Sequence, residues 1–232
     1  VVANMSEALG QPVRAFSIGF DEDEFNETPY AAQAAKRCGA DHTIEIVRPD
    51  ALEVLTKLVG HYGEPFGDSS AVPTFYVSEL ARRHVPMVLS GDGADELFSG
   101  YWSHGHFLNF CDSTAGRPPQ LSDWLQFIHY TDVATRQSLW RPEWRSHCPS
   151  RLDAFPQAWE QAIHLSPANK AQYLDLKTYL PFDILTKVDV ASMAHGLEVR
   201  TPFVDMRVAE LAARIPDRFN IQRGANGDWE RK

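Results

Sequence analysis

The sequence has few cysteines. Its 232 residues include three, Cys38, Cys111 and Cys148. An odd number of widely spaced cysteines fits neither a disulfide framework nor a set of zinc ligands. We therefore expect a reducing environment and a cytoplasmic location.

Long apolar runs and an excess of basic residues are also absent. No stretch reaches the roughly 18 consecutive apolar residues that a membrane-spanning helix needs, and the first residues do not resemble a signal peptide. The chain carries 31 acidic and 22 basic residues, a net charge of −9. Without a basic stripe to neutralise phosphates, duplex nucleic acid is not the expected partner. The lack of a long apolar run argues against a membrane.

The first half of the chain alternates between helix and strand patterns. Helices are expected up to Gly10, from Thr28 to Gly39, from Asp50 onward and over 78–84, with strands over 13–20, 43–47 and 87–89. This alternation predicts an α/β fold, in which a doubly wound parallel sheet has helices on both faces.

The second half has a different texture. Residues 102–165 predict a mostly helical insertion, with its clearest helix over 121–130, and residues 166–232 a helical C-terminal part. A pair of helices is expected there, interrupted at Pro181. We interpret residues 1–101 as the nucleotide-binding core of one catalytic domain. Because the chain starts at Val1 and ends in a polar run from Asn226, we expect it to be a piece of a longer protein.

The sharpest signal is an acidic, glycine-rich turn directly after an apolar strand. Residues 90–96 read Ser-Gly-Asp-Gly-Ala-Asp-Glu. Ser90 and Gly91 allow the backbone to approach a ligand closely, and the start of a helix favours an anion. A carboxylate can face an anionic nucleotide only if a divalent cation lies between them. We therefore interpret Asp95 as a ligand of nucleotide-bound Mg²⁺.

This turn has two other interpretations. It could be a tight, solvated turn that ends a strand, with no ligand. A calcium loop of the EF-hand type requires ligands at alternate positions and a glutamate at the twelfth, and residues 90–101 lack that spacing.

Four segments, in order along the chain, resemble the asparagine synthetase B-type, glutamine-hydrolysing family. The turn continues as Ser-Gly-Asp-Gly-Ala-Asp-Glu-Leu-Phe-Ser-Gly-Tyr, which is similar to that family's second signature. The other similar segments are 14–20, 63–74 and 187–205. The resemblance covers residues 1 to about 215.

The resemblance implies a sheet of the adenine nucleotide α-hydrolase-like, PP-loop type and a ligase that forms C–N bonds. Such an enzyme uses ATP to adenylate a carboxylate, by default that of aspartate, and releases pyrophosphate. Ammonia from glutamine then displaces AMP to give an amide, by default asparagine. The resemblance thus implies ATP and Mg²⁺, small-molecule substrates and an N-terminal glutaminase domain in the full protein. A homodimer is left open.

The resemblance also implies roles for residues of the strands and the turn. Ile18 would offer backbone groups to the adenine edge, and Ser90 and Gly91 would bind ATP phosphates through backbone donors. Asp92 would lie beside the acyl acceptor carbon, where a carboxylate can orient an amine or take its proton.

Charged residues of the C-terminal segments have two interpretations. By resemblance, Lys187 and Glu198 would be catalytic and Asp183 would face the substrate amine, but a buried helix can also carry such charges as a structural network. Arg200 is expected to hold a loop. His104 and His106 are two residues apart and have no third ligand nearby, which is weak support for a metal site. We therefore expect both histidines to be ordinary surface residues.

The sequence departs from the family pattern in one important respect. The family's pyrophosphate loop would lie immediately before Val1, and a further lysine would follow residue 232, so we predict that this chain alone is inactive.

Two alternative functions stay open. One is another adenylating enzyme, of the tRNA-thiolating or NAD synthetase type, against which segment 197–205 argues. The other is a non-catalytic relative.

Overall fold

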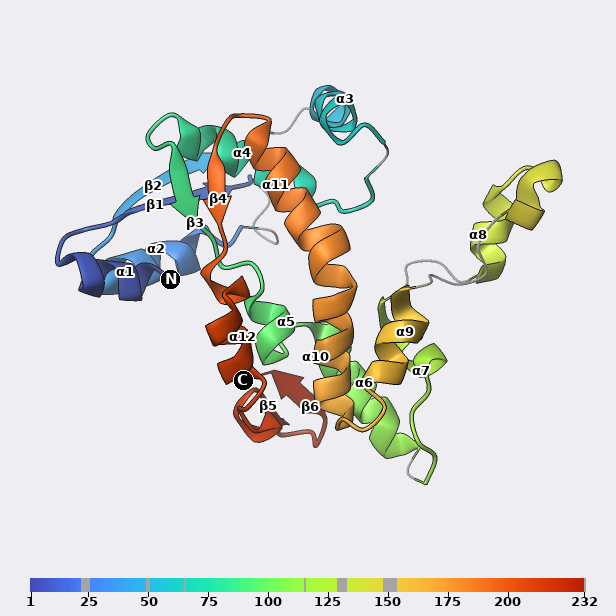
Figure 1. Ribbon diagram of the computed structural model, residues 1–232. Helices are drawn as coiled ribbons and strands as arrows, with labels where there is room; N and C mark the ends of the chain where they lie inside the picture. Colours follow the sequence, from blue (N-terminus) through green and yellow to red (C-terminus); the bar gives the residue numbers. More distant parts are fainter. Residues whose placement is uncertain are drawn as a thin grey trace. The chain divides into compact units, whose positions relative to one another are not determined.

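A computed structural model describes residues 1–21, 26–48, 51–64, 66–114, 116–128, 133–147 and 154–231. The chain divides into two compact units (Figure 1). Unit 1 comprises Val1–Gly91 and Asp183–Pro202, and unit 2 comprises Asp92–Phe182 and Phe203–Lys232. The boundary at Gly91 and Asp92 falls inside the acidic turn.

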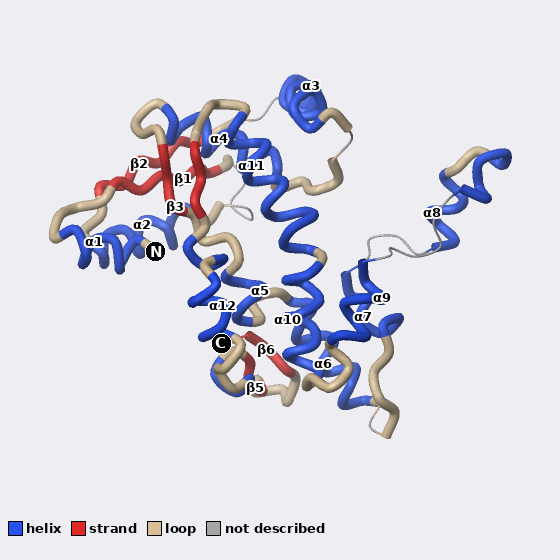
Figure 2. The backbone as a smooth tube through the Cα atoms, in the orientation of Figure 1, coloured by secondary structure: helices blue, strands red, loops and turns tan. Residues whose placement is uncertain are grey.

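Unit 1 contains two parallel pairs of strands. β1 (Arg14–Gly19) pairs with β2 (Asp41–Ile46), and β3 (Met87–Leu89) pairs with β4 (Glu198–Arg200). Helix α2 (Thr28–Cys38) contacts both β1 and β2, and α4 (Ala71–Arg82) contacts β1 (Figure 2). A mixed α/β fold with small parallel sheets is therefore confirmed. The continuous doubly wound sheet stays a prediction.

The glycines that were expected to end two helices do so. Gly10, after α1 (Val2–Leu9), has φ 61° and Gly39, after α2, has φ 62°. In this left-handed conformation their N–H groups return to carbonyls of the last helical turn, which glycine allows without a steric penalty. Helix α3 (Ala51–Tyr62) follows β2, and its expected first residue, Asp50, lies outside the described residues.

The core of unit 1 joins α3, α4 and α11 (Leu185–Met193). Val54 and Leu58 of α3 pack with Phe75 of α4 and Ala191 of α11. Burial of such side chains stabilises the fold by roughly 1.5–3 kcal/mol each. This packing fixes the start of α11, where Lys187 lies, against the segment that enters α4.

Unit 2 is mostly helical, with a core of Phe107, Trp124 and Leu174 and small residues between them. Its helices are α5 (Ala94–Phe98), α6 (Trp102–Ser113), α7 (Leu121–Ile128), α8 (Val133–Leu139), α9 (Ala154–Gln161), α10 (Pro167–Lys177) and α12 (Met206–Ala212), with 3₁₀ turns over Pro142–His147 and Asp217–Phe219. Helix α6 was missed by the sequence pattern. The proposed limits of an insertion at residues 102 and 165 stay a prediction.

The interruption expected at Pro181 is confirmed. A π-helical turn over Leu180–Ile184 separates α10 from α11. Pro181 has no N–H group and cannot donate to the preceding turn, so one wider turn accommodates it. The boundary between the units, at Phe182 and Asp183, lies within this turn.

The C-terminal part, which was expected to be helical, also contains short strands. Ile221–Arg223 (β5) and Trp229–Arg231 (β6) form an antiparallel hairpin. A Cβ atom at Gly105 of α6 would lie 2.6 Å from the Trp229 carbonyl oxygen, so this glycine lets the hairpin pack against α6. Three-residue strands such as β4, β5 and β6 are too short to give a periodic pattern.

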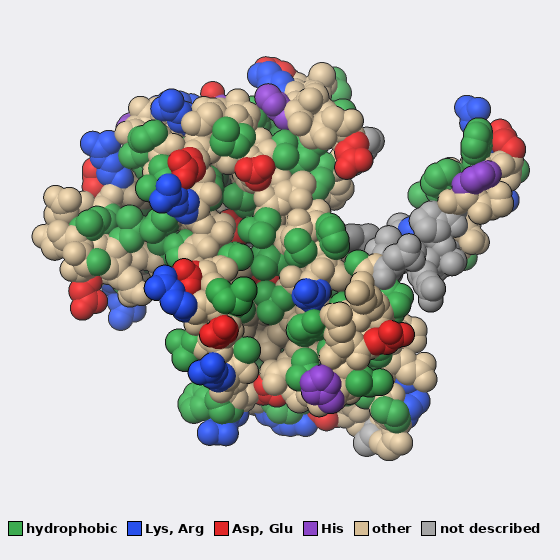
Figure 3. Space-filling view, viewed as in Figure 1, with side chains coloured by type: hydrophobic (Ala, Val, Ile, Leu, Met, Phe, Trp, Pro, Cys, Tyr) green, Lys and Arg blue, Asp and Glu red, His purple; other side chains and the backbone are tan. Residues whose placement is uncertain are grey.

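The surface is mixed in charge. On the face drawn in Figure 3, acidic and basic side chains are interspersed with hydrophobic ones. Among the described residues, no helix is both long enough and apolar enough to cross a membrane. Cys38 and Cys111 have free thiols, and Cys148 lies outside the described residues.

Candidate functional site

In unit 1, the predicted nucleotide-binding residues lie near the carboxyl ends of strands. Ile18 is half-buried next to the last residue of β1 and pairs in register with Glu45 of β2. Gly91 lies just beyond β3, and a Cβ atom there would meet nothing within 4 Å. A ligand can therefore approach the backbone at Gly91 closely.

Ser90 differs from the prediction in one respect. Its N–H group donates to the Arg200 carbonyl at 2.9 Å. This bond extends the β3–β4 pairing by one residue, because an N–H group of a parallel strand bonds to its neighbour. The Ser90 N–H is thus engaged in the sheet, which a sequence pattern without β4 could not reveal.

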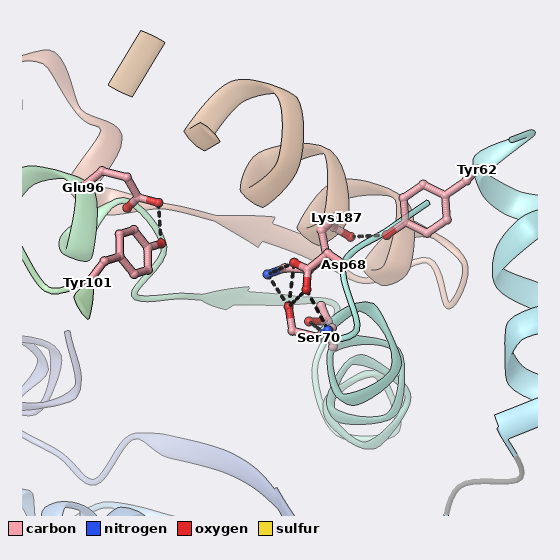
Figure 4. A network of polar contacts seen from close by, with 7 residues as sticks. Tyr62, Asp68, Ser70, Glu96, Tyr101 and Lys187 are labelled. Carbon is pink, nitrogen blue, oxygen red and sulfur yellow. Dashed lines mark hydrogen bonds and ion pairs between the residues drawn. The ribbon is translucent and has the colours of Figure 1, made fainter. Parts of the chain in front are cut away.

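Lys187 lies in a buried polar group that we call the Lys187 cluster, formed by Tyr62, Asp68, Ser70, Asp183 and Lys187. Figure 4 shows Tyr62, Asp68, Ser70 and Lys187 of this cluster. The Lys187 Nζ donates to Asp68 Oδ2 at 3.0 Å and to Ser70 Oγ at 2.7 Å. The Lys187 side chain is 9% exposed and that of Asp68 is 13% exposed. A buried ion pair of this kind is stable only when further hydrogen bonds satisfy its partners.

Asp68 is satisfied by several donors. Its Oδ1 accepts from the Ser70 backbone N–H at 2.8 Å, and the Ser70 hydroxyl also bonds to the carboxylate. These bonds lie directly before α4, whose N-cap residue, Ser70, makes no side-chain capping hydrogen bond. Burial alone would raise the pKa of Asp68, but the hydrogen bonds from Ser70 and Lys187 outweigh it and lower the pKa.

Asp183 is the less satisfied carboxyl group of the cluster. Burial and the nearby charge of Asp68 raise the pKa of Asp183 to about 6, although Lys187 opposes the shift. Its Oδ1 atom is buried and has no hydrogen-bond partner in the part of the chain that the structure describes. Two carboxyl groups beside one lysine leave an excess negative charge, and strongly shifted pKa values often mark functional sites.

Tyr62 connects the cluster to a cavity of about 220 Å³. The Tyr62 hydroxyl donates to the Lys187 carbonyl at 3.1 Å, and its ring stacks on Phe66 with centroids 4.3 Å apart. Burial and the charge of Asp68 raise the pKa of Tyr62 to about 12. The cavity wall is mostly apolar, from Leu55, Leu58, Val59 and Val72, with Asp68 and Ser69 as its polar part.

Glu198 differs from the residues of the Lys187 cluster in its exposure to solvent. It begins β4 and pairs in register with Met87, and its side chain is 57% exposed. Its Oε1 accepts from Arg200 Nε at 2.7 Å. The structure thus brings Lys187 and Asp183 together, whereas Glu198 forms an exposed ion pair with Arg200.

In unit 2, the acidic residues form a compact structure that we call the Asp95 turn, residues 92–101. Asp92 precedes Gly93, which has φ 93° and caps α5. Asp95 and Glu96 occupy the first turn of α5, where the helix dipole favours negative charge. None of the other described residues donates a hydrogen bond to the Asp95 carboxylate.

The contact between Glu96 and Tyr101 was not predicted from the sequence. Glu96 is 1% exposed, and its Oε1 accepts from the Tyr101 hydroxyl at 2.7 Å (Figure 4). Burial raises the pKa of Glu96, the hydrogen bond from Tyr101 opposes this, and Asp175 and Asp95 add to it. Both residues belong to the family-like segment 90–101, but that segment gave no sign of their mutual contact.

The surface location expected for His104 is wrong. His104 is fully buried, with Nε2 at 2.9 Å from Asp175 Oδ2 of α10, and its ring stacks on Trp124. His106 is exposed, as expected. Because Asp175 lies 71 residues along the chain, local spacing could not reveal this contact. The pair holds α6 to α10 in the core of unit 2.

The chemistry of the Asp95 turn fits Mg²⁺. Among the described residues, no group of three or more His, Cys, Asp or Glu side chains is arranged to hold a metal ion. Magnesium, however, is commonly bound by one or two carboxylates together with substrate phosphates. A single carboxylate at the start of a helix, without a protein donor among the described residues, suits that mode of binding.

Comparisons with known proteins agree on one family. The family model described as asparagine synthase matches residues 1–229. The chain is 27% identical to asparagine synthetase [glutamine-hydrolyzing] 1 of Bacillus subtilis, over 96% of this chain and 40% of that protein. It is 30% identical to a putative asparagine synthetase [glutamine-hydrolyzing] of Mycobacterium bovis, over 90% of this chain and 36% of that protein.

A more distant relative has a different name. The amidase chyE of Penicillium rubens is 22% identical over 95% of this chain and 40% of its own length. The chain therefore spans about two fifths of the length of these curated relatives.

Proposed function

The chain belongs to the asparagine synthase family, and from this membership we propose that it forms the ATP-dependent synthetase part of a glutamine-dependent amidotransferase. The full protein would join ammonia to a carboxylic acid, by default aspartate. Since the chain covers 36–40% of these asparagine synthetases, an N-terminal glutaminase domain belongs to the proposal. The proposal also includes a cytoplasmic location and a continuous doubly wound sheet of the PP-loop type. It leaves open whether the full protein forms a homodimer.

The proposed reaction has two steps. A substrate carboxylate oxygen attacks the α-phosphorus of ATP, and the bond to the β-phosphate oxygen breaks, which gives an acyl adenylate and pyrophosphate. The ammonia nitrogen then attacks the acyl carbon, and the bond to AMP breaks. One nitrogen-bound proton leaves, so that the products are the amide, AMP and pyrophosphate.

Residues near the strand ends would bind ATP. Ile18 would offer its backbone to the adenine edge, and the backbone at Ser90 and Gly91 would approach the phosphates. Asp95 would hold Mg²⁺, which when bound neutralises charge on the phosphate oxygens. Preformed donors in place for developing charge are effective because they need not reorganise during the reaction.

Other carboxylates would act on the amine and on the acyl substrate. Asp92 would orient the incoming nitrogen or take its proton. Asp183, with its raised pKa, would face the substrate amine, and Lys187 would fix the charge of Asp68 beside it. Glu198 completes the proposed catalytic set from an exposed position on β4.

The observation that carries the proposal is the position of the acidic turn. It begins directly at the carboxyl end of β3, a strand of a parallel pair. Ligands of open α/β sheets bind at the carboxyl ends of strands. Gly91 offers an open backbone there, and Asp95 follows at the start of α5.

Isotope exchange between pyrophosphate and ATP tests the proposal on the full-length protein. Exchange should require both a carboxylic acid and Mg²⁺. The Asp95→Ala variant should lose about 10³-fold or more of the exchange rate, because several kcal/mol of charge stabilisation is removed.

A matched variant controls for the general loss of a carboxylate. Asp41 is exposed at the start of β2, and Asp41→Ala should exchange at the wild-type rate. Unchanged exchange in Asp95→Ala would remove Asp95 from the metal site. Absence of acid-dependent exchange in the wild-type protein would favour the non-catalytic alternative.

Aspartate is the default acyl substrate, and exchange measured with a panel of carboxylic acids would test it. The asparagine synthetase names of the first relatives favour aspartate as the default, whereas the fungal relative is named an amidase. Exchange that is fastest with another acid would change the substrate and keep the adenylating chemistry.

A further inference from the structure

Gly100 lies directly against the Asp95 side chain. A Cβ atom at position 100 would come within 1.8 Å of Asp95 Oδ1, 2.7 Å of Asp95 Cγ and 2.9 Å of Asp95 Cα. Such distances are far shorter than van der Waals contact. The carboxylate can therefore keep its place only because residue 100 has no side chain.

The backbone brings Gly100 to this position by a sharp reversal after α5. Ser99 has φ 57° and is 1% exposed. Among the described residues, it is the one non-glycine with a positive φ, a conformation that costs of order 1 kcal/mol or more and persists where surrounding contacts hold it. The Gly100 N–H then donates to the Asp95 carbonyl at 2.9 Å.

Side chains from three places hold this reversal. The Tyr101 hydroxyl donates to Glu96 Oε1 at 2.7 Å, Gln172 Nε2 of α10 donates to the Leu97 carbonyl at 2.9 Å, and Arg231 Nη1 of β6 donates to the Gly100 carbonyl at 3.0 Å. All of these residues belong to unit 2. The residues that follow Asp95 in the turn are thus fixed, while its own carboxylate accepts no hydrogen bond from the rest of the described chain.

We propose that Gly100 is a positioning residue for metal binding: the space left by its missing side chain sets the place of the Asp95 carboxylate, and Tyr101, Gln172 and Arg231 fix that space. This inference rests on the proposed role of Asp95 in holding Mg²⁺. It adds that the ligand is held ready by the turn before the metal arrives. Groups that orient a metal ligand commonly affect metal affinity by about 10- to 100-fold.

The test measures how strongly a metal ion strengthens nucleotide binding to the full-length protein. Mn²⁺ serves as the probe, and a non-hydrolysable ATP analogue is titrated with and without it, while proton relaxation reports bound Mn²⁺. In Gly100→Ala, the strengthening by Mn²⁺ should fall by about 10- to 100-fold, while binding of the metal-free analogue stays unchanged. A purely structural defect would weaken both.

Two controls separate this inference from the proposed function. Gly60→Ala places a methyl group in open space on α3 and should leave the effect of Mn²⁺ intact. Asp95→Ala should abolish the effect. If Asp95→Ala keeps it, the metal role of Asp95 fails. If Asp95→Ala loses it and a folded Gly100→Ala keeps it, only the positioning role of Gly100 is overturned.

A milder variant decides the matter if Gly100→Ala does not fold. Tyr101→Phe removes one hydroxyl group and with it the bond to Glu96. Since Gln172 and Arg231 remain, the strengthening by Mn²⁺ should fall only about threefold. Wild-type strengthening by Mn²⁺ in a folded Tyr101→Phe protein would then contradict the proposal.

Discussion

The Lys187 cluster of unit 1 and the Asp95 turn of unit 2 both contain carboxylates, but the hydrogen bonding of Asp68 in the cluster differs from that of Asp95 in the turn. Asp68 in the cluster accepts hydrogen bonds from Lys187 and Ser70. Asp95 is held in place by its backbone and by the space at Gly100, and the described residues around it donate nothing to its oxygens. A carboxylate whose hydrogen bonds are satisfied stabilises a fold, whereas one that is fixed and unsatisfied is ready for a ligand.

The largest effect on stability is expected when the Lys187 cluster is disrupted. Lys187→Ala removes the cation beside Asp68 and leaves a mostly buried carboxylate with the hydrogen bonds from Ser70 but without its ion-pair partner. We expect the free energy of unfolding to fall by about 2–4 kcal/mol, measured by urea denaturation. Lys57→Ala, which breaks an exposed pair with Glu53, should have no measurable effect.

An equally stable Lys187→Ala protein would contradict this account. It would show that the cluster is not a structural support, and the catalytic interpretation of Lys187 would then stand alone. A destabilised protein that is still folded at low temperature allows exchange to be measured as well, which separates the two roles.

The next effect concerns pH and Asp183. Burial and Asp68 raise the pKa of Asp183 from 3.8 to about 6. A carboxyl group with a raised pKa binds its proton more tightly in the folded state. Its stabilising contribution is therefore complete below pH 3.8 and is lost as the pH rises through about 6.

Asp183→Asn should remove this loss. We expect the decline in the free energy of unfolding between pH 3.8 and about 6 to become smaller by about 1 kcal/mol, a value reduced for solvent screening because Asp183 is only half-buried. Denaturation curves across this range, with Asp41→Asn as a control, measure it. Asp68 acts in the opposite direction, because the stability from its lowered pKa is lost as the pH falls. An unchanged slope in Asp183→Asn would mean that Asp183 does not titrate abnormally.

The smallest effect on stability is expected at Glu198. Its ion pair with Arg200 is exposed, with both side chains more than half accessible to solvent, and such pairs contribute little. Glu198→Gln should therefore leave the denaturation curve unchanged, while exchange falls about tenfold if Glu198 acts on substrate. Unchanged exchange would remove Glu198 from the proposed catalytic set.

Much of unit 1 could be predicted because its signals are local. Gly10 and Gly39 mark helix ends, and the apolar run at residues 87–89 followed by the acidic turn needs only neighbouring residues to be recognised. In unit 2, Pro181 likewise acts on its own turn. The family-like segments then indicated which of these local features belong to a site.

The rest could not be predicted, because it depends on residues far apart in the sequence. The partner strand of β3 begins at Glu198, opposite Met87. Its Arg200 carbonyl accepts from the Ser90 N–H, which the sequence predicted as a donor to the ATP phosphates. His104 is buried by a contact with Asp175. The role of Gly100 depends on a backbone reversal at Ser99, a residue type that does not usually indicate positive φ.

The central claim is that Asp95 receives the metal carried by ATP. The most direct measurement is a crystal structure of the full-length protein with Mn²⁺ and a non-hydrolysable ATP analogue, in which anomalous scattering locates the metal. We predict a Mn²⁺ peak about 2.0–2.2 Å from an Asp95 carboxylate oxygen and in contact with the phosphates. A peak elsewhere, with the Asp95 carboxylate hydrogen-bonded to a protein donor, would contradict it.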